Sequence, residues 1–92
     1  MGMMEDKDVK KVIELLVPLF DKVVTVTPSN PRSMKSENLA EIIKNCGVFA
    51  ESFDDEVKGL EYAVKGLDND EILIVCGSLY LCSDLYKYFR CN

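Results

Sequence analysis

The stretch Glu71-Ile72-Leu73-Ile74-Val75-Cys76-Gly77-Ser78-Leu79-Tyr80-Leu81 decides the fold expected for this chain of 92 residues. Its first part is an apolar run over 72–76, rich in β-branched residues, which is typical of a parallel strand buried on both faces. Gly77 and Ser78 break the run, and apolar residues then recur at helical spacing through 89. Because helix N-termini offer free N–H groups beside the carboxyl ends of parallel strands, this strand-to-helix turn is a candidate ligand site.

The rest of the chain alternates in the same way. Helices are expected after Asp8, with Pro18 ending the first of them, after Ser36 as N-cap, and after Ser52 or Asp54. Strands are expected over 22–27, 48–53 and 71–76. The order α-β-α-β-α-β-α predicts one α/β domain over residues 1–92, a three-layer α/β/α arrangement with a mostly parallel sheet. Three strands are few for this architecture, so the sheet looks short at its front end.

Composition narrows the class of partner. The chain has 16 acidic and 11 basic residues and a net charge of −5, which argues against nucleic acid or an anionic membrane as the partner. No apolar run approaches the roughly 20 residues that span a bilayer, and no signal peptide is recognisable. A cytoplasmic protein is therefore expected.

No catalytic constellation can be read from the sequence. The chain has no histidine, and its four cysteines, Cys46, Cys76, Cys82 and Cys91, form no CxxC pair, so no common zinc spacing exists. Phosphate-binding P-loop and dinucleotide-binding motifs are absent as well. We predict buried, reduced thiols, with a nucleophilic Cys76 as the alternative, and assign no catalytic and no metal-binding residue.

Two sites could bind an anion. At the first, the Ser78 hydroxyl and the free N–H groups of the following helix could hold a carboxylate, although Ser78 could equally be an ordinary N-cap. At the second, Asn30-Pro31-Arg32 lies in a proline-stiffened loop after a strand, where arginine can clamp a carboxylate through two parallel hydrogen bonds or can simply be solvated. Both loops should emerge at the same edge of the sheet.

Several of these stretches resemble the C-terminal portion of folylpolyglutamate synthase/dihydrofolate synthase, in the Mur ligase superfamily. They occur in the family's order and cover nearly the whole chain. The stretches that carry the resemblance are Gly2-Met3-Met4-Glu5-Asp6-Lys7-Asp8-Val9, Leu16-Val17-Pro18-Leu19-Phe20-Asp21-Lys22-Val23, Asn30-Pro31-Arg32-Ser33 and Gly77-Ser78-Leu79-Tyr80-Leu81.

The resemblance implies a Rossmann-like domain of an ATP-dependent amide ligase. In that family ATP phosphorylates a folate or dihydropteroate carboxylate, the amine of L-glutamate attacks the acyl phosphate, and Mg²⁺ stabilises the phosphates. By position, Arg32, Ser78 and Asn30 are the residues expected to face glutamate, and Asp6 and Lys7 are expected on the ATP side or at a domain contact. The family's P-loop ATPase domain and its first strand-helix unit are absent here, so the chain is expected to be a truncated domain, inactive alone.

Two further expectations follow from the residues themselves. A free-standing α/β interaction module, or a receiver-like one with an acidic Asp6/Asp8 pair and magnesium, is the alternative function. A parallel sheet that lacks strands would expose an apolar edge, which predicts self-association through that edge.

Overall fold

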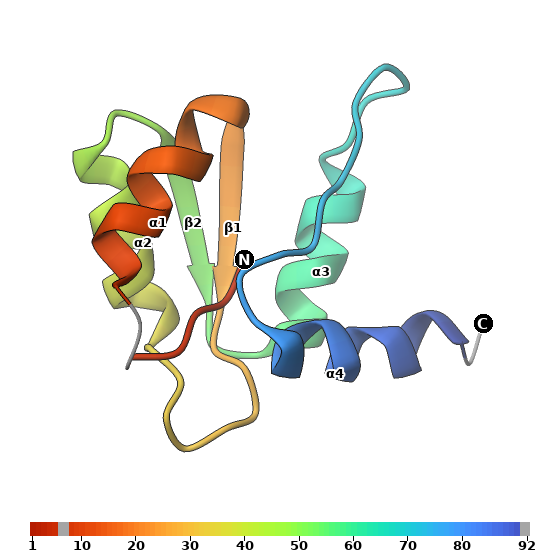
Figure 1. Ribbon diagram of the computed structural model, residues 1–92. Coiled ribbons are helices and arrows are strands. Elements are labelled where there is room, and N and C mark those ends of the chain that lie inside the picture. Colours follow the sequence, from red (N-terminus) through yellow and green to blue (C-terminus); the bar gives the residue numbers. More distant parts are fainter. Residues whose placement is uncertain (6–7, 91–92) are drawn as a thin grey trace.

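The computed structural model describes residues 1–5 and 8–90 and forms a small α/β domain (Figure 1). Its elements in chain order are α1 (Val9–Leu16), the 3-10 helix η1 (Val17–Leu19), β1 (Lys22–Val26), α2 (Ser36–Asn45), β2 (Phe49–Phe53), α3 (Glu56–Lys65) and α4 (Leu79–Arg90). The two strands pair in parallel, from Lys22 opposite Phe49 to Val26 opposite Phe53. The predicted α/β class with a parallel sheet is confirmed.

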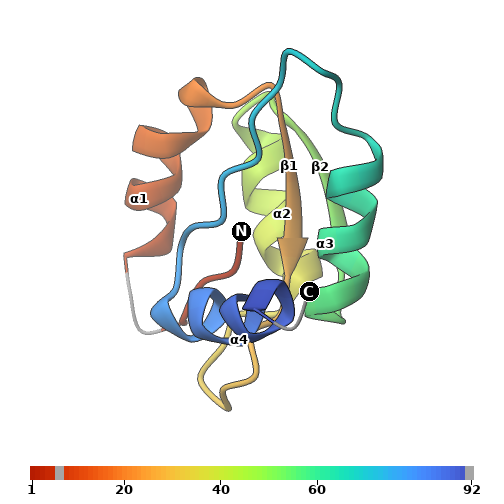
Figure 2. The same ribbon diagram turned by 90° about the vertical axis from the view of Figure 1, so that its right-hand side faces the viewer.

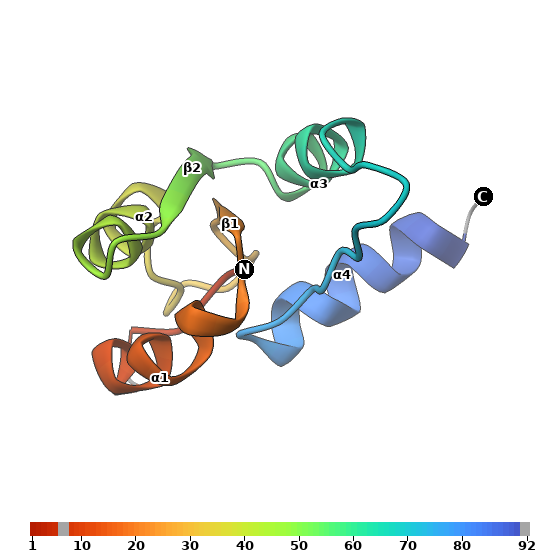
Figure 3. The same cartoon turned by 90° about the horizontal axis from the view of Figure 1, so that it is seen from above.

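Helices cover both faces of the sheet, as Figure 3 shows from above. On one face α1 and α2 pack against Val23 and Ala50 through a core that includes Ile13, Leu39 and Ile43. On the other face Val26 contacts a second core, formed by Leu60 of α3 and by Leu81 and Leu85 of α4. The alternation of a β-strand explains this division, since neighbouring residues of β1 point to opposite faces.

The local sequence signals explain most element boundaries. α1 gives way to η1 at Val17 because Pro18 lacks the N–H that a continuing α-helix needs. β1 is almost entirely β-branched, and Gly47, directly after the C-cap of α2, adopts the expected positive φ of 86°. The strand expected over 48–53 is β2, which pairs with β1 alone among the described residues.

The third predicted strand, over 71–76, is not formed. The segment is extended but carries no strand ladder, and it leaves Ile72 85% and Ile74 58% exposed. Leu73 and Val75, which alternate with them, pack against the core of α3 and α4. The prediction of a strand buried on both faces is therefore wrong for residues 72–75, where only the side of Leu73 and Val75 packs against a core.

The missing ladder has a physical cause at the N-terminus. Met1 and Gly2 lie between β1 and the 71–76 segment, as the views in Figures 1 and 2 both show. Met1 pairs with β1, since its amino group donates to Val24 O at 2.7 Å and its carbonyl accepts from Val26 N at 2.9 Å. Gly2 N donates to Cys76 O at 3.3 Å on the other side. Cys76 is therefore the residue through which the 71–76 segment bonds to this backbone, and residues 71–75 form no ladder with it or with β1 in the described part of the chain.

Two predicted helix caps are wrong. Ser36 does not cap α2 but is its first residue, and its N–H donates to the Thr27 hydroxyl at 3.0 Å. Its own hydroxyl donates to Asp54 Oδ1 at 3.0 Å, which ties Asp54 to α2 rather than to α3. Asp55 instead caps α3, accepting the N–H groups of Val57 and Lys58.

One cysteine that was expected to be buried, and two valines of α3, are exposed. Cys46 is exposed because it lies at the C-cap of α2, where the helix turns away from the core. Val57 and Val64 of α3 are also exposed, at 37% and 48%. The helix instead presents Gly59 and Leu60 to the sheet, and Gly59 allows an approach in which an added Cβ would lie 2.3 Å from Val26 Cγ1.

Gly77 is expected to tolerate no side chain. Its φ is +106°, and a Cβ would lie 2.3 Å from the carbonyl oxygen of Gly2. Gly47 is the matched control, with φ of +86° but nothing within 4 Å of an added Cβ. Gly47→Ala should lower the free energy of unfolding by about 1 kcal/mol through backbone strain alone. Gly77→Ala should lower it by about 2–4 kcal/mol, because the clash adds to that strain. Urea unfolding followed by circular dichroism measures both, and equal losses would contradict the close approach to Gly2.

Candidate functional site

The carboxyl end of the sheet gathers the candidate residues. The loop after β1, the turn at Gly77–Ser78 and the beginnings of α3 and α4 all lie at the lower end of the domain in Figure 1. Gly2 touches both connections, since an added Cβ there would lie 2.7 Å from Pro28 Cγ and one on Gly77 would lie 2.3 Å from Gly2 O. The structure therefore places the two predicted loops at one end of the sheet, as parallel strands require.

The Asn30-Pro31-Arg32 loop is held by its own hydrogen bonds. Asn30 Oδ1 accepts the N–H of Arg32 at 2.9 Å, and Asn30 O accepts the N–H of Ser33 at 2.9 Å. Arg32 O accepts the N–H of Glu5 at 2.8 Å, which joins the loop to the N-terminal segment. Asn30 thus shapes the turn and fixes the backbone of Arg32, which is an exposed residue.

Ser78 caps α4. Its side chain is buried, and its Oγ accepts the N–H of Tyr80 at 3.1 Å and that of Leu81 at 3.5 Å. A hydroxyl that accepts these bonds still has one hydrogen to donate. Ser78 is therefore the ordinary N-cap that the sequence also allowed. Its hydroxyl can still donate a hydrogen bond to a carboxylate.

Asp6, Lys7, Asp8 and Cys76 are the remaining residues for which a role was predicted. Asp6 and Lys7 lie outside the described residues, and neighbouring Asp8 is exposed and makes no side-chain cap bond to α1. Within residues 1–5 and 8–90, no group of three or more His, Cys, Asp or Glu side chains could hold a metal ion. Burial raises the pKa of the Cys76 thiol above its ordinary value, which disfavours the thiolate that a nucleophile needs.

Sequence reasoning missed an acidic pair at the same end. Glu56 begins α3 and Asp84 lies on α4, and the Ser29 hydroxyl donates to Asp84 Oδ2 from the loop after β1. The pKa of Glu56 is raised to about 7, first by burial, then by a hydrogen bond to Asp84 and by the negative charges of Asp84 and Asp55. Glu56 Oε2 is buried without a hydrogen-bond partner in the described part of the chain. No local pattern announces this pair, because its members lie 28 residues apart in the sequence.

A small polar pocket lies beside the loop that joins β1 to α2. It has a volume of about 270 Å³ and is lined by Thr27, Lys35, Glu37 and Asp54. Charges of both signs meet there at the start of α2, where the helix N-terminus adds partial positive charge. The carboxyl end of the sheet therefore offers cationic, anionic and neutral polar groups for a small charged ligand.

Comparison with known families identifies the domain. Residues 1–79 match the family described as Mur ligase, glutamate ligase domain. The chain belongs to the Mur ligase family. A search of curated proteins finds no match for this Mur ligase domain. No helix in the described part of the chain is long and apolar enough to cross a membrane.

Two solved structures have the same fold as this Mur ligase domain. E. coli FolC, in complex with DHPP and ADP, matches with a TM-score of 0.90 and 22% identity over 99% of this chain. The bifunctional folylpolyglutamate synthase/dihydrofolate synthase of Yersinia pestis, complexed with AMPPNP and a Mn ion, matches with a TM-score of 0.85 and 26% identity over 97%. The chain covers 21% of each of these proteins. The similarity to folylpolyglutamate synthase/dihydrofolate synthase inferred from the sequence is confirmed.

The raised pKa of Glu56 predicts a pH-dependent stability. A carboxyl group whose pKa rises on folding, here from 4.5 to about 7, stabilises the fold below pH 4.5, and this contribution is lost as the pH rises to 7. Glu56→Gln mimics the protonated form, so it should raise the melting temperature at pH 8, by roughly 5 °C, and have little effect at pH 4.5.

Thermal unfolding of the variant and the parent at both pH values tests this effect. The variant must be compared with the parent because the Met1 amine also titrates. Burial lowers the pKa of this amine, so its contribution to stability increases as the pH rises, opposite to that of Glu56. Glu61→Gln, on the exposed side of the same helix, controls for the loss of one negative charge. The same pH dependence in Glu56→Gln and in the parent would contradict the assignment.

Proposed function

We propose that this chain is the glutamate-binding domain of an ATP-dependent folate:L-glutamate ligase and that it is inactive on its own. The observation that carries the proposal is the meeting of the Asn30–Arg32 loop and the Ser78 turn at one end of a domain whose family is described as a glutamate ligase domain. Similarity to the Yersinia pestis synthase, at 26% identity, supports a folate-type substrate for the complete enzyme.

Arg32 and Ser78 have complementary tasks in this proposal. The Arg32 guanidinium pairs with a carboxylate of glutamate through two parallel hydrogen bonds, a geometry that lysine cannot copy. The Ser78 hydroxyl donates its remaining hydrogen to the amino acid. Asn30 acts indirectly, because its bond to the Arg32 N–H fixes the backbone from which the guanidinium reaches out.

The described residues of this chain do not fit a nucleotide with its metal ion. The sequence contains no P-loop, and the described residues contain no cluster that could hold a metal ion. We therefore assign ATP and Mg²⁺ to a P-loop domain outside this chain. That assignment is why the isolated domain should neither hydrolyse ATP nor bind folate detectably. A ligase with these substrates would act in the cytoplasm, in one-carbon metabolism.

A chimeric enzyme tests the glutamate site. The chain would replace the equivalent stretch of the Yersinia pestis synthase, and Arg32→Ala would then be assayed with varied glutamate. We expect the KM for glutamate to rise roughly tenfold or more, the effect of losing a charge-assisted hydrogen bond, while the KM values for ATP and folate stay unchanged. Arg32→Lys should fall between the parent and Arg32→Ala, because lysine keeps the charge and loses the paired geometry.

Lys44→Ala provides the matched control. Lys44 is an exposed cation in the last turn of α2, close to the start of β2 and so at the amino end of the sheet. Its removal changes the net charge as Arg32→Ala does but should leave the KM for glutamate unaltered. An unchanged KM in Arg32→Ala, or an equal rise in Lys44→Ala, would refute the assigned role of Arg32.

A further inference from the structure

A series of side-chain hydrogen bonds joins the loop after β1 to α4 and α3. The Ser29 hydroxyl donates to Asp84 Oδ2, and Asp84 shares a hydrogen bond with Glu56 at the start of α3. Ser29 belongs to the loop that carries Arg32. Asp84 lies in the second turn of α4, the helix that Ser78 caps. The series therefore connects the two segments that hold the proposed glutamate-binding residues.

The carboxyl pair of Glu56 and Asp84 needs a proton to form its hydrogen bond. Two ionised carboxylates have no hydrogen to donate to each other. Glu56 Oε2 is buried, and no donor among the described residues reaches it. A proton on Glu56 supplies the missing donor, and Asp84 can then accept from Glu56 as well as from Ser29.

Neighbouring charges decide which member of the carboxyl pair holds the proton. The bond from Ser29 lowers the pKa of Asp84 most strongly, and the positive charge of Lys87 on the same helix adds to this effect. Burial raises the pKa of Glu56 to about 7, helped by Asp84 and by Asp55 at the N-cap of α3. Glu56 is therefore the member that is protonated below pH 7 and ionised above it.

The segments packed around the carboxyl pair carry few other charges. Within the described residues, these charged side chains are Arg32, Asp54 and Lys58. Asp54 accepts the hydroxyl of Ser36 on α2, and the other two side chains are exposed. A change of charge on Glu56 therefore acts first on Asp84.

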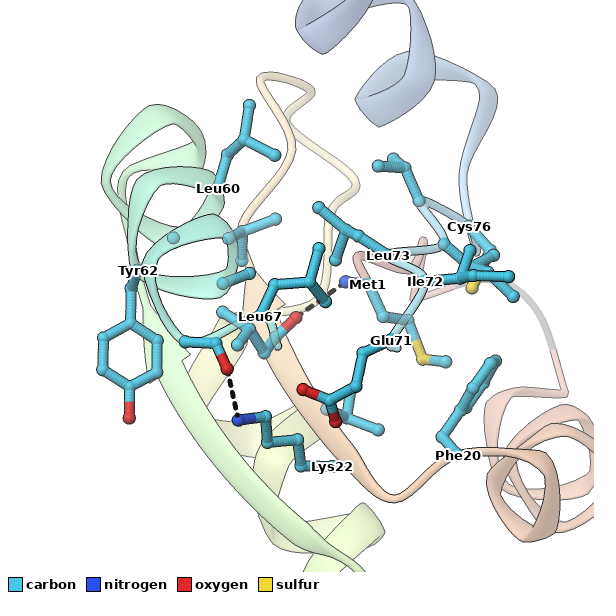
Figure 4. A pocket seen from close by; sticks show the side chains of 18 of the residues that line it. Met1, Phe20, Lys22, Leu60, Tyr62, Leu67, Glu71, Ile72, Leu73 and Cys76 are labelled. Atoms are coloured by element: carbon cyan, nitrogen blue, oxygen red, sulfur yellow. Dashed lines mark hydrogen bonds between the residues drawn. The ribbon is translucent and has the colours of Figure 1, made fainter. Parts of the chain in front are cut away.

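The packing beside the carboxyl pair is open. A groove of about 650 Å³ lies between α3 and the 71–76 segment that leads into α4, and Glu56 is among its lining residues (Figure 4). Figure 4 shows Leu60 of α3 and Cys76 on opposite sides of this groove. Leu60, one turn after Glu56, belongs to the apolar core that α3 shares with α4. The contact between the two helices therefore depends on that small core and on the carboxyl pair.

We propose that Asp84 and Glu56 are positioning residues whose shared proton holds the Arg32 loop against α4. Loss of this proton leaves two negative charges side by side, so Asp84 turns away from Glu56 and its bond to Ser29 is lost. The distance between Arg32 and Ser78 is then no longer fixed from this side. This inference rests on the proposed glutamate function, and it makes glutamate binding tighter below pH 7 than above it.

Nuclear magnetic resonance of the full 92-residue chain tests this positioning without any reaction. The amide shift of Arg32 should titrate together with the carboxyl carbon of Glu56, with a midpoint near 7. Glu56→Gln keeps a donor for Asp84 and cannot ionise, so the Arg32 amide should stay at its low-pH position. Glu61→Gln, exposed on the same helix, is the matched control and should titrate like the parent.

Ser29→Ala separates the loop from the carboxyl pair. Ser29 is exposed, so the variant should fold like the parent. The Glu56 carboxyl should still titrate, whereas the Arg32 amide should lose its pH-dependent shift. An Arg32 amide that does not titrate in the parent would overturn the proposal, and so would one that titrates equally in Glu56→Gln or in Ser29→Ala.

The chimeric enzyme described above provides the functional measurement. Its KM for glutamate should be roughly fivefold higher at pH 8 than at pH 6, the lower end of the usual coupling between two sites. Glu56→Gln should remove this rise, and an equal rise in Glu56→Gln and the parent would refute the positioning role. The two proposals fail separately. An unchanged KM in Arg32→Ala refutes the glutamate site, and with it the role of the carboxyl pair in binding, even where the loop titrates. A loop that does not titrate refutes the positioning alone and leaves the glutamate site standing.

Discussion

The hydrogen bonds of the Met1–Gly2 backbone connect the two halves of this domain. On one side they continue the sheet from β1, and on the other they reach Cys76. The 71–76 segment has no other backbone pairing with the sheet in the described residues, so the position of α4 depends on this contact and on the packing of Leu81 and Leu85. Gly77 carries the same constraint, because its turn passes against the Gly2 carbonyl where no side chain fits.

The N-terminal segment that makes these hydrogen bonds also positions the candidate site. Glu5 N bonds to Arg32 O, and Gly2 packs against Pro28, so the N-terminal segment supports the loop after β1 as well as the turn before α4. The bond from Ser29 to Asp84 then ties that loop to α4 directly. The geometry between Arg32 and Ser78 is therefore set by contacts among segments far apart in the sequence.

Features encoded locally could be predicted from the sequence. The helices follow from apolar spacing, the end of α1 from Pro18, and the positive φ at residue 47 from glycine after a C-cap. The outcome for residues 71–76 could not, because a strand exists only with a paired neighbour, and in the described residues this segment bonds to the N-terminal backbone only at Cys76. Ser36 was misread because its N–H bonds to the distant Thr27 hydroxyl and its own hydroxyl donates to Asp54, instead of accepting N–H groups of the following turn. For the site, the location of Arg32 and Ser78 at one end of the domain could be predicted, because each follows an expected strand. The pairing of Glu56 with Asp84 could not, because it depends on the packing of two helices.

The direction of the helices accounts for the charge pattern at the site. Parallel strands joined by helices place the N-termini of α2, α3 and α4 at the carboxyl end of the sheet, each with partial positive charge. Acidic residues in these first turns, Glu37 and Glu56, are stabilised by that charge, although burial and Asp84 outweigh it for Glu56. An anion entering here meets this acidic rim, so helix ends alone would not attract it. A guanidinium such as that of Arg32, on a loop fixed by Asn30, is a group able to reverse the local balance, which is why we propose Arg32 for glutamate recognition rather than the helix termini.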